Sequence, residues 1–417
     1  MLRVRPFEAI RPHPTNVARV ASPPYDVVNE DEARALAAEN PQSFLRVVRS
    51  EIDLPPDTSP YDDAVYETAR RNLDRMLETN VMMREDEPRM YIYRQVRNHR
   101  RQAGLVCCCH IDDYANGTIK KHEKTRRDKE DDRTRHVLAT DANSGPVFLT
   151  YRKDLAVQRF MIDDMNHRPL FHFDADDGVT HTVWTVVDPG RYVDAFSNVP
   201  AAYVADGHHR TASAARAGAE RRAANPDHTG NEPYNWFLTV LFPAEDLTIL
   251  AYNRVIRTLG DRTADEVRDA LAAVGTLTAS PDGGFEPERA GIFAVYLDGG
   301  WYRLELDPAT IDAADPIASL DVDLLQRRIM EPVFGIGDPR TDTRLAFVGG
   351  SRGLDELERL VDSGEGAVAI AMHPTSIEQL LDVSDAGLIM PPKSTWFEPK
   401  LRSGLFVYRL DESPVMK

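Results

Sequence analysis

The sequence predicts a mixed α/β protein, and three patterns lead to this prediction. An Asp-Gly pair stands between two alternating apolar runs within residues 171–187, which is typical of a β-hairpin. Residues 61–80 carry an apolar side chain at every fourth position from Val65 to Leu77, so we expect an amphipathic helix there. The last third of the chain alternates strand-like and helix-like segments, which indicates a C-terminal α/β unit.

The other elements follow from short apolar runs and the residues that bound them. The first forty residues are rich in proline and read as loops around short strands. Strands are predicted at 89–96 and 104–111 (a pair with a basic tip), 201–206, 236–242 and 247–252 (neighbours), 291–306 (a hairpin), 344–350 and 367–374. Helices are predicted from the end of strand 201–206 to about residue 225, at 264–274, and after each of the last two strands.

This pattern predicts that the chain divides into two regions with approximate boundaries. Residues 1–260 form an N-terminal region that contains the candidate catalytic and nucleotide-binding motif at 204–218. Residues 261–417 form a C-terminal α/β region, which we expect to contribute the loop at 390–405 to the same site.

Composition and charge exclude several classes of function. The 417 residues are 42% hydrophobic and 28% charged, as in soluble globular proteins. Acidic residues number 67 against 50 Lys and Arg, and the net charge of -17 repels nucleic-acid backbones, so we expect no nucleic-acid partner. The N-terminus lacks the apolar core of a signal peptide, and no apolar run approaches the roughly 20 residues that span a bilayer. We therefore expect a cytoplasmic protein without a membrane partner.

The three cysteines are consecutive, at Cys107, Cys108 and Cys109, and His110 follows them. Neighbouring residues of a strand point to opposite faces, so these cysteines cannot form an ordinary disulfide framework. The segment can be a zinc site or a buried strand. Because the residues around the cysteines are apolar, we favour the buried strand.

The stretch D-G-H-H-R, Asp206 to Arg210, is the leading candidate site. It stands where an apolar strand ends and an alanine-rich helix begins. Amide groups at a helix start attract anions, and His209 and Arg210 add side-chain donors for phosphate oxygens. Gly207 permits a tight turn, and Asp206 can hold Mg²⁺ or orient a hydroxyl. The alternative is a polar turn in which Asp206 caps the helix and the other side chains only coat the surface.

Two further polar clusters are weaker candidates. Residues 120–125, K-K-H-E-K-T, include Glu123 and Lys124 and can bind phosphate, hold a base or form a solvated loop. Residues 390–405 concentrate cations and hydroxyls in an acidic chain and can form either an anion site or a basic surface turn. The members of this second cluster that we select are Lys393, Ser394, Lys400 and Arg402.

The motifs of the common nucleotide-binding folds and of the zinc peptidases do not occur in the sequence. There is no G-x-x-x-x-G-K-[ST] loop, no G-x-G-x-x-G after a strand and no H-E-x-x-H pair.

Five motifs, in order, resemble a bacterial and archaeal family catalogued as domain of unknown function number one thousand and fifteen. They are P-P-Y-D-V, N-P-Q-S-F-L-R-V, H-E-K-T, A-D-G-H-H-R-T-A-S-A and M-P-P-K-S-T-W-F-E-P-K-L-R-S-G-L. This resemblance runs from near residue 1 to about residue 410. The family implies no settled activity.

The D-G-H-H-R motif is also similar to the phosphate-binding motif of the ParB and sulfiredoxin superfamily, especially its free-serine kinases. In those kinases the motif opens a helix and grips nucleotide phosphates, which implies a strand–turn–helix phosphate site here. His208 stands where sulfiredoxins have their cysteine, so a thiol reaction is disfavoured. About 190 residues separate the superfamily-like opening of the chain from the motif, so a shared fold must contain a large insertion.

These resemblances imply a kinase that phosphorylates a small hydroxyl metabolite, with free L-serine first, using ATP or ADP and Mg²⁺. Asp206, His208 and Glu123 are the expected catalytic residues, with Asp206 as the Mg²⁺ ligand and Asp26 as a second candidate base. The expected nucleotide-binding residues are Gly207, His209, Arg210, Thr211, Lys124, Lys393, Ser394, Lys400 and Arg402.

We expect Asp206, His209, Glu123 and Lys393 to line one pocket, and Arg210 to face the ligand rather than the core. The alternatives are a non-catalytic nucleotide-binding switch of the ParB type and a hydrolase of nucleotides or phosphoesters.

Overall fold

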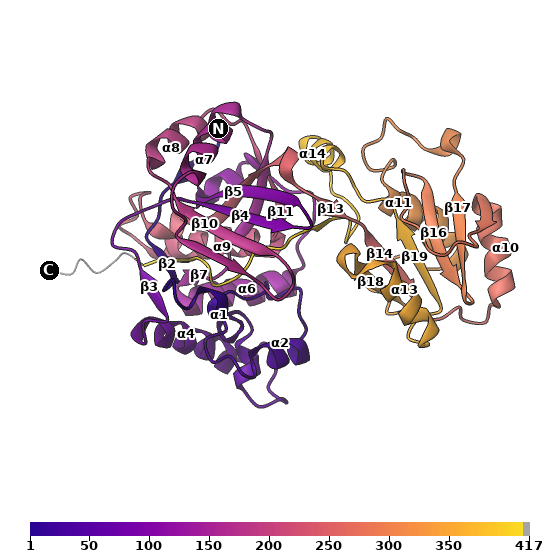
Figure 1. Cartoon of the computed structure of the whole chain (residues 1–417), viewed down its shortest axis with the longest axis horizontal. Helices are drawn as coiled ribbons and strands as arrows, with labels where there is room; N and C mark the ends of the chain where they lie inside the picture. The colour runs from indigo at the N-terminus through magenta and orange to yellow at the C-terminus, as the bar shows by residue number, and fades with distance from the viewer. Residues whose placement is uncertain (412–417) are drawn as a thin grey trace. The chain divides into compact units, whose positions relative to one another are not determined.

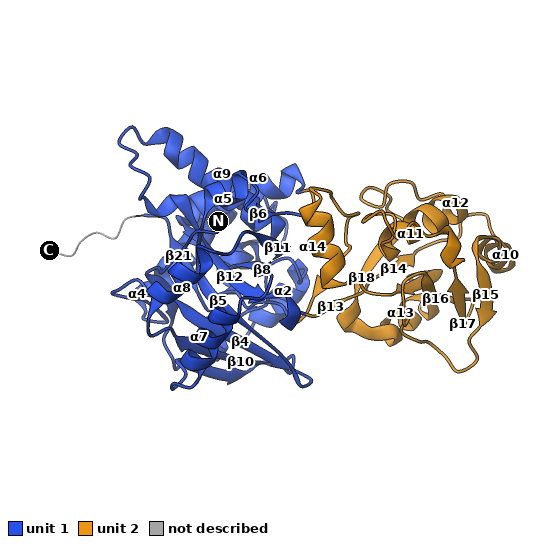
Figure 2. Ribbon diagram, turned by 90° about the horizontal axis from the view of Figure 1, so that it is seen from above, with its two compact units in different colours: residues 1–121, 125–247, 399–417 blue, residues 122–124, 248–398 orange. Residues whose placement is uncertain are grey.

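A computed structural model describes residues 1–411, which form two compact units. Unit 1 comprises residues 1–121, 125–247 and 399–411, and unit 2 comprises residues 122–124 and 248–398 (Figure 2). The last described residues, 399–411, therefore belong to the same unit as the N-terminal residues. None of the described helices is both long and apolar enough to cross a membrane.

Unit 1 contains two sheets (Figure 1). The nine-stranded sheet has the order β6-β11-β8-β12-β5-β4-β10-β9, with β1 paired to β5, and the four-stranded sheet has the order β3-β2-β21-β7. The large sheet consists of β1 (Val4–Arg5), β4 (Tyr91–Arg97), β5 (Arg100–His110), β6 (Ile119–Lys120), β8 (Val147–Tyr151), β9 (Phe171–Asp174), β10 (Thr180–Thr185), β11 (Ala202–Asp206) and β12 (Trp236–Pro243). The small sheet consists of β2 (Ala9–Pro12), β3 (Met82–Arg84), β7 (Ala142–Asn143) and β21 (Val407–Arg409).

Helices pack around these sheets. They are α1 (Val17–Val20), α2 (Glu30–Ala37), α3 (Leu45–Val48), α4 (Asp63–Glu78), α5 (Ile111–Ala115), α6 (Arg127–Thr140), α7 (Leu155–Met165), α8 (Pro189–Phe196) and α9 (His208–Ala224), with 3-10 turns at Ser50–Asp53, Pro233–Asn235 and Ala244–Asp246. Helices α6 and α9 lie side by side (Figure 1), and the Ser213 hydroxyl donates to the Glu130 carbonyl at 3.1 Å between them.

Several predicted elements of unit 1 are confirmed. Strands β4 and β5 pair antiparallel, as do β9 and β10 around the Asp-Gly turn. Helix α4 buries Val65, Ala69 and Leu73, and Asp62 caps it by accepting from the Ala64 amide. The cysteine segment is a buried strand, β5, in which Cys107 and Cys109 belong to one core cluster.

Helix α2 was not predicted, because the start of the chain reads as proline-rich loops. A capping box defines its beginning: the Asn29 side chain accepts from the Glu32 amide, and the Glu32 carboxylate accepts from the Asn29 amide. The residues Asn29 and Glu32 at this spacing were therefore a usable signal in the sequence.

Unit 2 contains a six-stranded sheet of order β15-β17-β16-β19-β14-β18, and all of its pairings are antiparallel. Its strands are β14 (Tyr252–Ile256), β15 (Thr276–Ala279), β16 (Ile292–Leu297), β17 (Gly300–Glu305), β18 (Leu345–Gly349) and β19 (Val368–Met372), and β13 (Ile249–Leu250) pairs separately with β20 (Trp396–Phe397). Its helices are α10 (Ala264–Val274), α11 (Asp321–Leu325), α12 (Glu331–Phe334), α13 (Gly353–Asp362) and α14 (Ile377–Asp385), with 3-10 turns at Pro308–Thr310 and Gly350–Arg352 and a π-helical turn at Gln326–Met330.

The predicted α10, the hairpin β16–β17 and the alternation β18-α13-β19-α14 are confirmed, so the C-terminal α/β unit exists. The prediction that the apolar runs 236–242 and 247–252 form neighbouring strands was wrong. The first run is β12, which lies between β5 and β8 in unit 1. The second run supplies β13 and the start of β14 in unit 2, which pair with β20 and β18 instead.

Candidate functional site

The candidate site is the junction between β11 and α9, where the backbone makes a turn that requires glycine. Gly207 adopts φ 93° and ψ 36°, in the left-handed region, and α9 begins at His208, as predicted. A Cβ atom on Gly207 would lie only 3.0 Å from Nε of Arg210. Gly207 therefore serves two purposes: it turns the chain, and it leaves room for the Arg210 guanidinium above the turn.

Asp206 does not cap the helix, so the alternative of a simple polar turn fails in this respect. Gly207 occupies the capping position, and no side chain caps the start of α9. Instead, Asp206 Oδ2 accepts from Arg210 Nη2 at 2.7 Å and Asp206 Oδ1 accepts from Lys400 Nζ at 2.8 Å. Lys400 lies shortly after β20, almost two hundred residues after the motif, so two distant segments of the sequence meet here.

The two cations determine the charge state of Asp206. Burial by itself would raise the pKa of Asp206. The Lys400 ammonium and the Arg210 guanidinium outweigh burial and hold that pKa well below its usual range. Asp206 is therefore ionised throughout the physiological pH range.

Arg210 does not point freely toward a ligand, contrary to our expectation. Its side chain is only 12% exposed, and Nη1 donates to the Pro146 carbonyl at 2.5 Å. Asp26 lies 3.9 Å from Nη2, so Arg210 bridges the P-P-Y-D segment and the motif. Within the described chain, Nε of Arg210 is buried and has no hydrogen-bond partner. Arg210 is thus built into the site and leaves one donor for a further group.

The other motif residues hold the helix starts together. His209 Nε2 accepts at 3.1 Å from the amide of Arg126, which is the residue that precedes α6. The Thr211 hydroxyl donates to the Gly207 carbonyl at 3.0 Å, and His208 is buried. Neither α6 nor α9 has a side-chain cap at its start. The positive ends of two helices therefore meet through His209, which favours an anion at this place.

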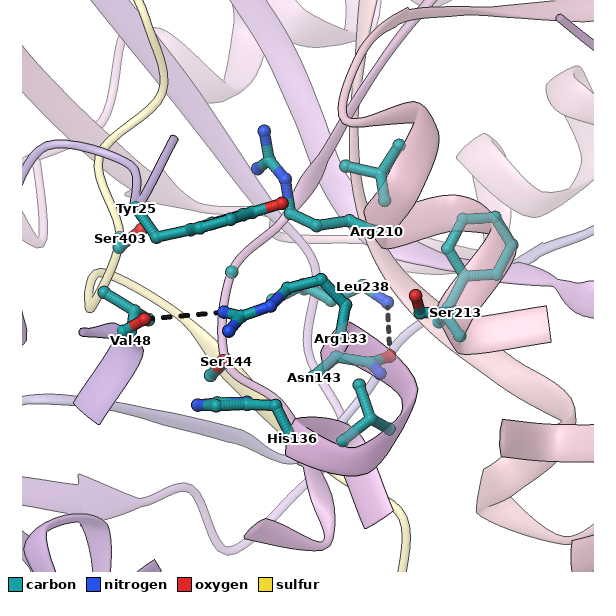
Figure 3. Close-up of a pocket in the computed structure, with 15 residues that line it drawn as sticks. Tyr25, Val48, Arg133, His136, Asn143, Ser144, Arg210, Ser213, Leu238 and Ser403 are labelled. Carbon is teal, nitrogen blue, oxygen red and sulfur yellow. Dashed lines mark hydrogen bonds between the residues drawn. The ribbon is translucent and has the colours of Figure 1, made fainter. Parts of the chain in front are cut away.

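A pocket lies beside Arg210 within unit 1 (Figure 3). Its polar lining consists of Tyr25, Arg133, His136, Asn143, Ser144, Arg210, Ser213 and Ser403, and its apolar lining includes Val48, Val137, Val147, Ala214, Phe237 and Leu238. The Arg133 guanidinium lies 4.4 Å from the centre of the Tyr25 ring, and the Tyr25 hydroxyl points toward Arg210. Cations and hydroxyls on an apolar base suit a small polar metabolite with a negative charge.

Sequence reasoning missed most of this pocket. Tyr25 stands beside Asp26 in the P-P-Y-D motif, so the motif itself was a signal for it. Arg133 and His136 belong to α6, which lies within a segment so rich in charges that no single residue stands out. Ser144 and Ser213 carry no pattern that distinguishes them from surface serines.

Because of His136, which lines the pocket, we expect the free energy of unfolding to depend on pH. Its Nε2 lies 2.9 Å from the Val47 carbonyl, and burial, together with Arg133, lowers the pKa of His136 to about 4. Because the unfolded chain binds a proton near pH 6.5, the stability from neutral His136 is complete above that pH and is lost as pH falls toward 4. The loss amounts to about 3 kcal/mol at 1.36 kcal/mol per pKa unit.

We expect His136→Gln to remove this part of the pH dependence, and His13→Gln, at an exposed position, to leave it intact. Urea unfolding of the three proteins between pH 7 and pH 4.5 measures the difference. Parallel stability curves for wild type and His136→Gln would contradict the assignment.

The remaining predicted residues have other partners. Arg402 Nη2 lies 2.6 Å from Asp177, and Arg402 Nε lies 3.4 Å from His181 Nε2. Lys393 lies in unit 2 with its Nζ 5.3 Å from the centre of the Tyr252 ring. The buried Ser394 hydroxyl donates to the Pro391 carbonyl at 2.7 Å, which stabilises the loop.

Glu123 and Lys124 also belong to unit 2, where the Met390 amide donates to the carbonyl of the preceding His122 at 2.8 Å. The H-E-K-T and M-P-P-K-S-T segments therefore meet. That Glu123 and Lys393 share a pocket with Asp206 stays a prediction.

Asp206 as it stands does not fit a Mg²⁺ site. Each of its carboxylate oxygens accepts a hydrogen bond from a cationic side chain, and the positive charges of Arg210 and Lys400 repel a metal ion. Among residues 1–411, no group of three or more His, Cys, Asp or Glu side chains could hold a metal ion.

Three solved structures are distantly similar to this chain. A conserved hypothetical protein from Pyrococcus furiosus is 12% identical, with a TM-score of 0.37, over 73% of this chain and 95% of that one. A free serine kinase in complex with AMP is 12% identical, with a TM-score of 0.37, over 72% and 91%. SbnI with a C-terminal truncation, from Staphylococcus aureus, is 11% identical, with a TM-score of 0.39, over 73% and 87%.

A search of curated proteins found no match. The model of one sequence family matches residues 4–323, which is more than half of the chain. The chain therefore belongs to the family described as protein of unknown function, DUF1015.

Proposed function

We propose that the protein is a nucleotide-dependent small-molecule kinase, which transfers a phosphoryl group from ATP or ADP to the hydroxyl of a small metabolite. One observation carries the proposal: the uncapped start of α9 stands between a fixed ion-pair cluster and a polar pocket. The resemblance of D-G-H-H-R to the free-serine kinases makes L-serine the first acceptor to test.

The phosphate side of the site is the start of α9. The start of α9 has no side-chain cap, and the positive end of the helix dipole there favours phosphate oxygens near His208, His209 and Arg210. Nε of Arg210 can add one charge-assisted hydrogen bond. In this scheme Asp206 is a positioning residue, because it holds Arg210 and Lys400 at 2.7 and 2.8 Å.

The acceptor side is the pocket of Figure 3. Arg133, although paired with Asp132 at 2.9 Å, adds positive charge that suits the carboxylate of an amino or hydroxy acid. Ser144 and Ser403 offer hydroxyls to the polar groups of the same small molecule.

The chemistry requires a base and a neutralised leaving group. The acceptor oxygen attacks the terminal phosphorus, the bond to the nucleotide oxygen breaks, and the acceptor proton passes to a carboxylate. Asp26 is the candidate base in unit 1, because it lies 3.9 Å from Arg210 and its side chain is partly exposed. Lys400 is placed to balance the charge on the leaving nucleotide. Roles for His208, Glu123, Lys124, Lys393 and Arg402 in this reaction, and Mg²⁺ as the partner of the nucleotide, stay predictions.

One experiment separates the candidate activities. The protein is incubated with Mg²⁺, a metabolite extract that contains L-serine, and ATP labelled in its γ-phosphate or ADP labelled in its β-phosphate. A kinase yields a labelled acceptor, which is the expected result. A hydrolase yields only labelled phosphate, and a nucleotide-binding switch of the ParB type yields neither, so either outcome would overturn the proposal.

A further inference from the structure

Unit 2 has a pocket of its own at one edge of its six-stranded sheet. Strands β18 and β19 both pair antiparallel with β14, so they run parallel to each other on either side of it. Their carboxyl ends therefore lie at the same edge, next to the beginning of β14. Residues of all three chain segments line the pocket, among them Asn253, Gly350 and His373.

The loop G-G-S-R-G, residues 349–353, carries the chain from β18 into α13 at this edge. A Cβ atom on Gly350 would lie 2.7 Å from the Ala251 carbonyl oxygen, so the loop packs tightly against β14 only because the residue is glycine. Gly353 has φ 76° and ψ −179°, a conformation that is essentially restricted to glycine. The ten-residue helix α13 starts without a side-chain cap, and Gly353 and Leu354 line the pocket. Amide groups of an uncapped helix start suit an anionic group.

Asn253 is a second and independent sign of a ligand. It lies on β14 between two neighbouring strands, is only 4% exposed and is one of the residues that line the pocket. Its Oδ1 atom is buried and has no hydrogen-bond partner within the described part of the chain. A buried amide normally has partners, and rotation of the amide can present either its donor or its acceptor to a bound molecule.

The remaining lining defines the class of ligand. Glu286, an exposed carboxylate, lines the pocket and suits a positive group. Leu354, Ala371 and Met372 provide apolar surface. The first turn of α13 also carries Asp355 and Glu356. Arg359 pairs with Glu356 at 2.8 Å, so the charge of Asp355 is the one that disfavours a phosphate dianion more than a carboxylate.

We propose that unit 2 binds a small, zwitterionic α-amino acid at this edge. Its carboxylate lies at the uncapped start of α13, its ammonium group lies toward Glu286, and its small side chain packs against the apolar lining. Asn253 donates to or accepts from the polar groups of the bound amino acid. The site is separate from the phosphoryl transfer proposed for unit 1, and neither proposal depends on the other.

Calorimetric titration of the full chain with L-alanine tests the site, since L-alanine has no hydroxyl to phosphorylate. We expect saturable binding of L-alanine, and at least tenfold weaker binding of N-acetyl-L-alanine and L-alaninamide, each of which lacks one charge. Asn253→Leu and Glu286→Gln should each weaken L-alanine binding at least tenfold. Glu288→Gln, two residues from Glu286 and paired with Arg303 rather than part of the pocket lining, should not change it.

The proposal is overturned if glycine, L-alanine and L-serine all fail to bind, if N-acetyl-L-alanine binds as tightly as L-alanine, or if binding survives Glu286→Gln. If Asn253→Leu does not fold, the comparison of Glu286→Gln with Glu288→Gln decides alone. A higher melting temperature of Asn253→Leu without any amino-acid binding to wild type would mean that Asn253 is only a poorly satisfied core residue, and would equally overturn the proposal.

Discussion

Arg210→Ala is expected to lower both the stability of the protein and its affinity for nucleotide. The substitution removes a partner of Asp206 and a hydrogen bond to the Pro146 carbonyl in a buried place. Breaking a buried ion pair by truncating one partner costs about 3 kcal/mol. Loss of one charge-assisted contact to phosphate should weaken nucleotide binding about ten- to a hundredfold. Thermal melts and calorimetric titration with ATP and ADP measure the two effects.

Arg216→Ala is the matched control, because Arg216 lies on the same helix and is 42% exposed. Its ion pairs with Asp131 and Glu220 are at the surface, so the stability loss should be about 1 kcal/mol or less, with unchanged nucleotide binding. Equal effects of Arg210→Ala and Arg216→Ala would show that the position of Arg210 beside Asp206 has no special role.

Asp206→Asn is expected to reduce phosphoryl transfer at least a hundredfold, as when a group that fixes transition-state charge is removed. The amide keeps the shape of the side chain but leaves Lys400 and Arg210 without their shared negative charge. The stability loss should again be about 3 kcal/mol. Steady-state rates and urea unfolding of the variant measure both, and Asp194→Asn, at an exposed position of α8, serves as the control.

A double-mutant cycle that combines Asp206→Asn with Lys400→Met tests whether the loss of stability comes from the contact between these two residues. If the two residues act as a pair, the stability loss of the double variant will be clearly smaller than the sum of the single losses. Additive losses would mean that the contact of 2.8 Å between Asp206 and Lys400 contributes nothing measurable.

The elements that sequence patterns predicted well are those with a local physical cause. The stripe in α4, the Asp-Gly hairpin and the start of α9 after Gly207 all depend on neighbours within a few residues. The wrong prediction was that the runs 236–242 and 247–252 form neighbouring strands. An apolar run indicates a strand, but it does not show which sheet the strand joins.

In the candidate site, too, local features were visible in the sequence and features that depend on tertiary structure were not. The cluster of charged residues from Asp206 to Arg210 was visible in the sequence, and Lys400, one of the residues selected from the loop at 390–405, contacts Asp206. That these residues bind a nucleotide stays a prediction. The burial of Arg210 was not visible, because it depends on the Pro146 carbonyl and on the path of Asp26, which only tertiary structure places nearby. For the same reason, Asn253 gave no signal in the sequence.

Hydrogen–deuterium exchange with and without ADP tests the central claim most directly, namely that nucleotide phosphates bind at the start of α9. A bound phosphate that accepts hydrogen bonds from the amides at a helix start slows the exchange of those amides with solvent. We predict that ADP slows exchange of the amides of residues 207–210, and that adenosine, which has no phosphate, does not. Exchange of this segment that stays unchanged at saturating ADP would contradict the account.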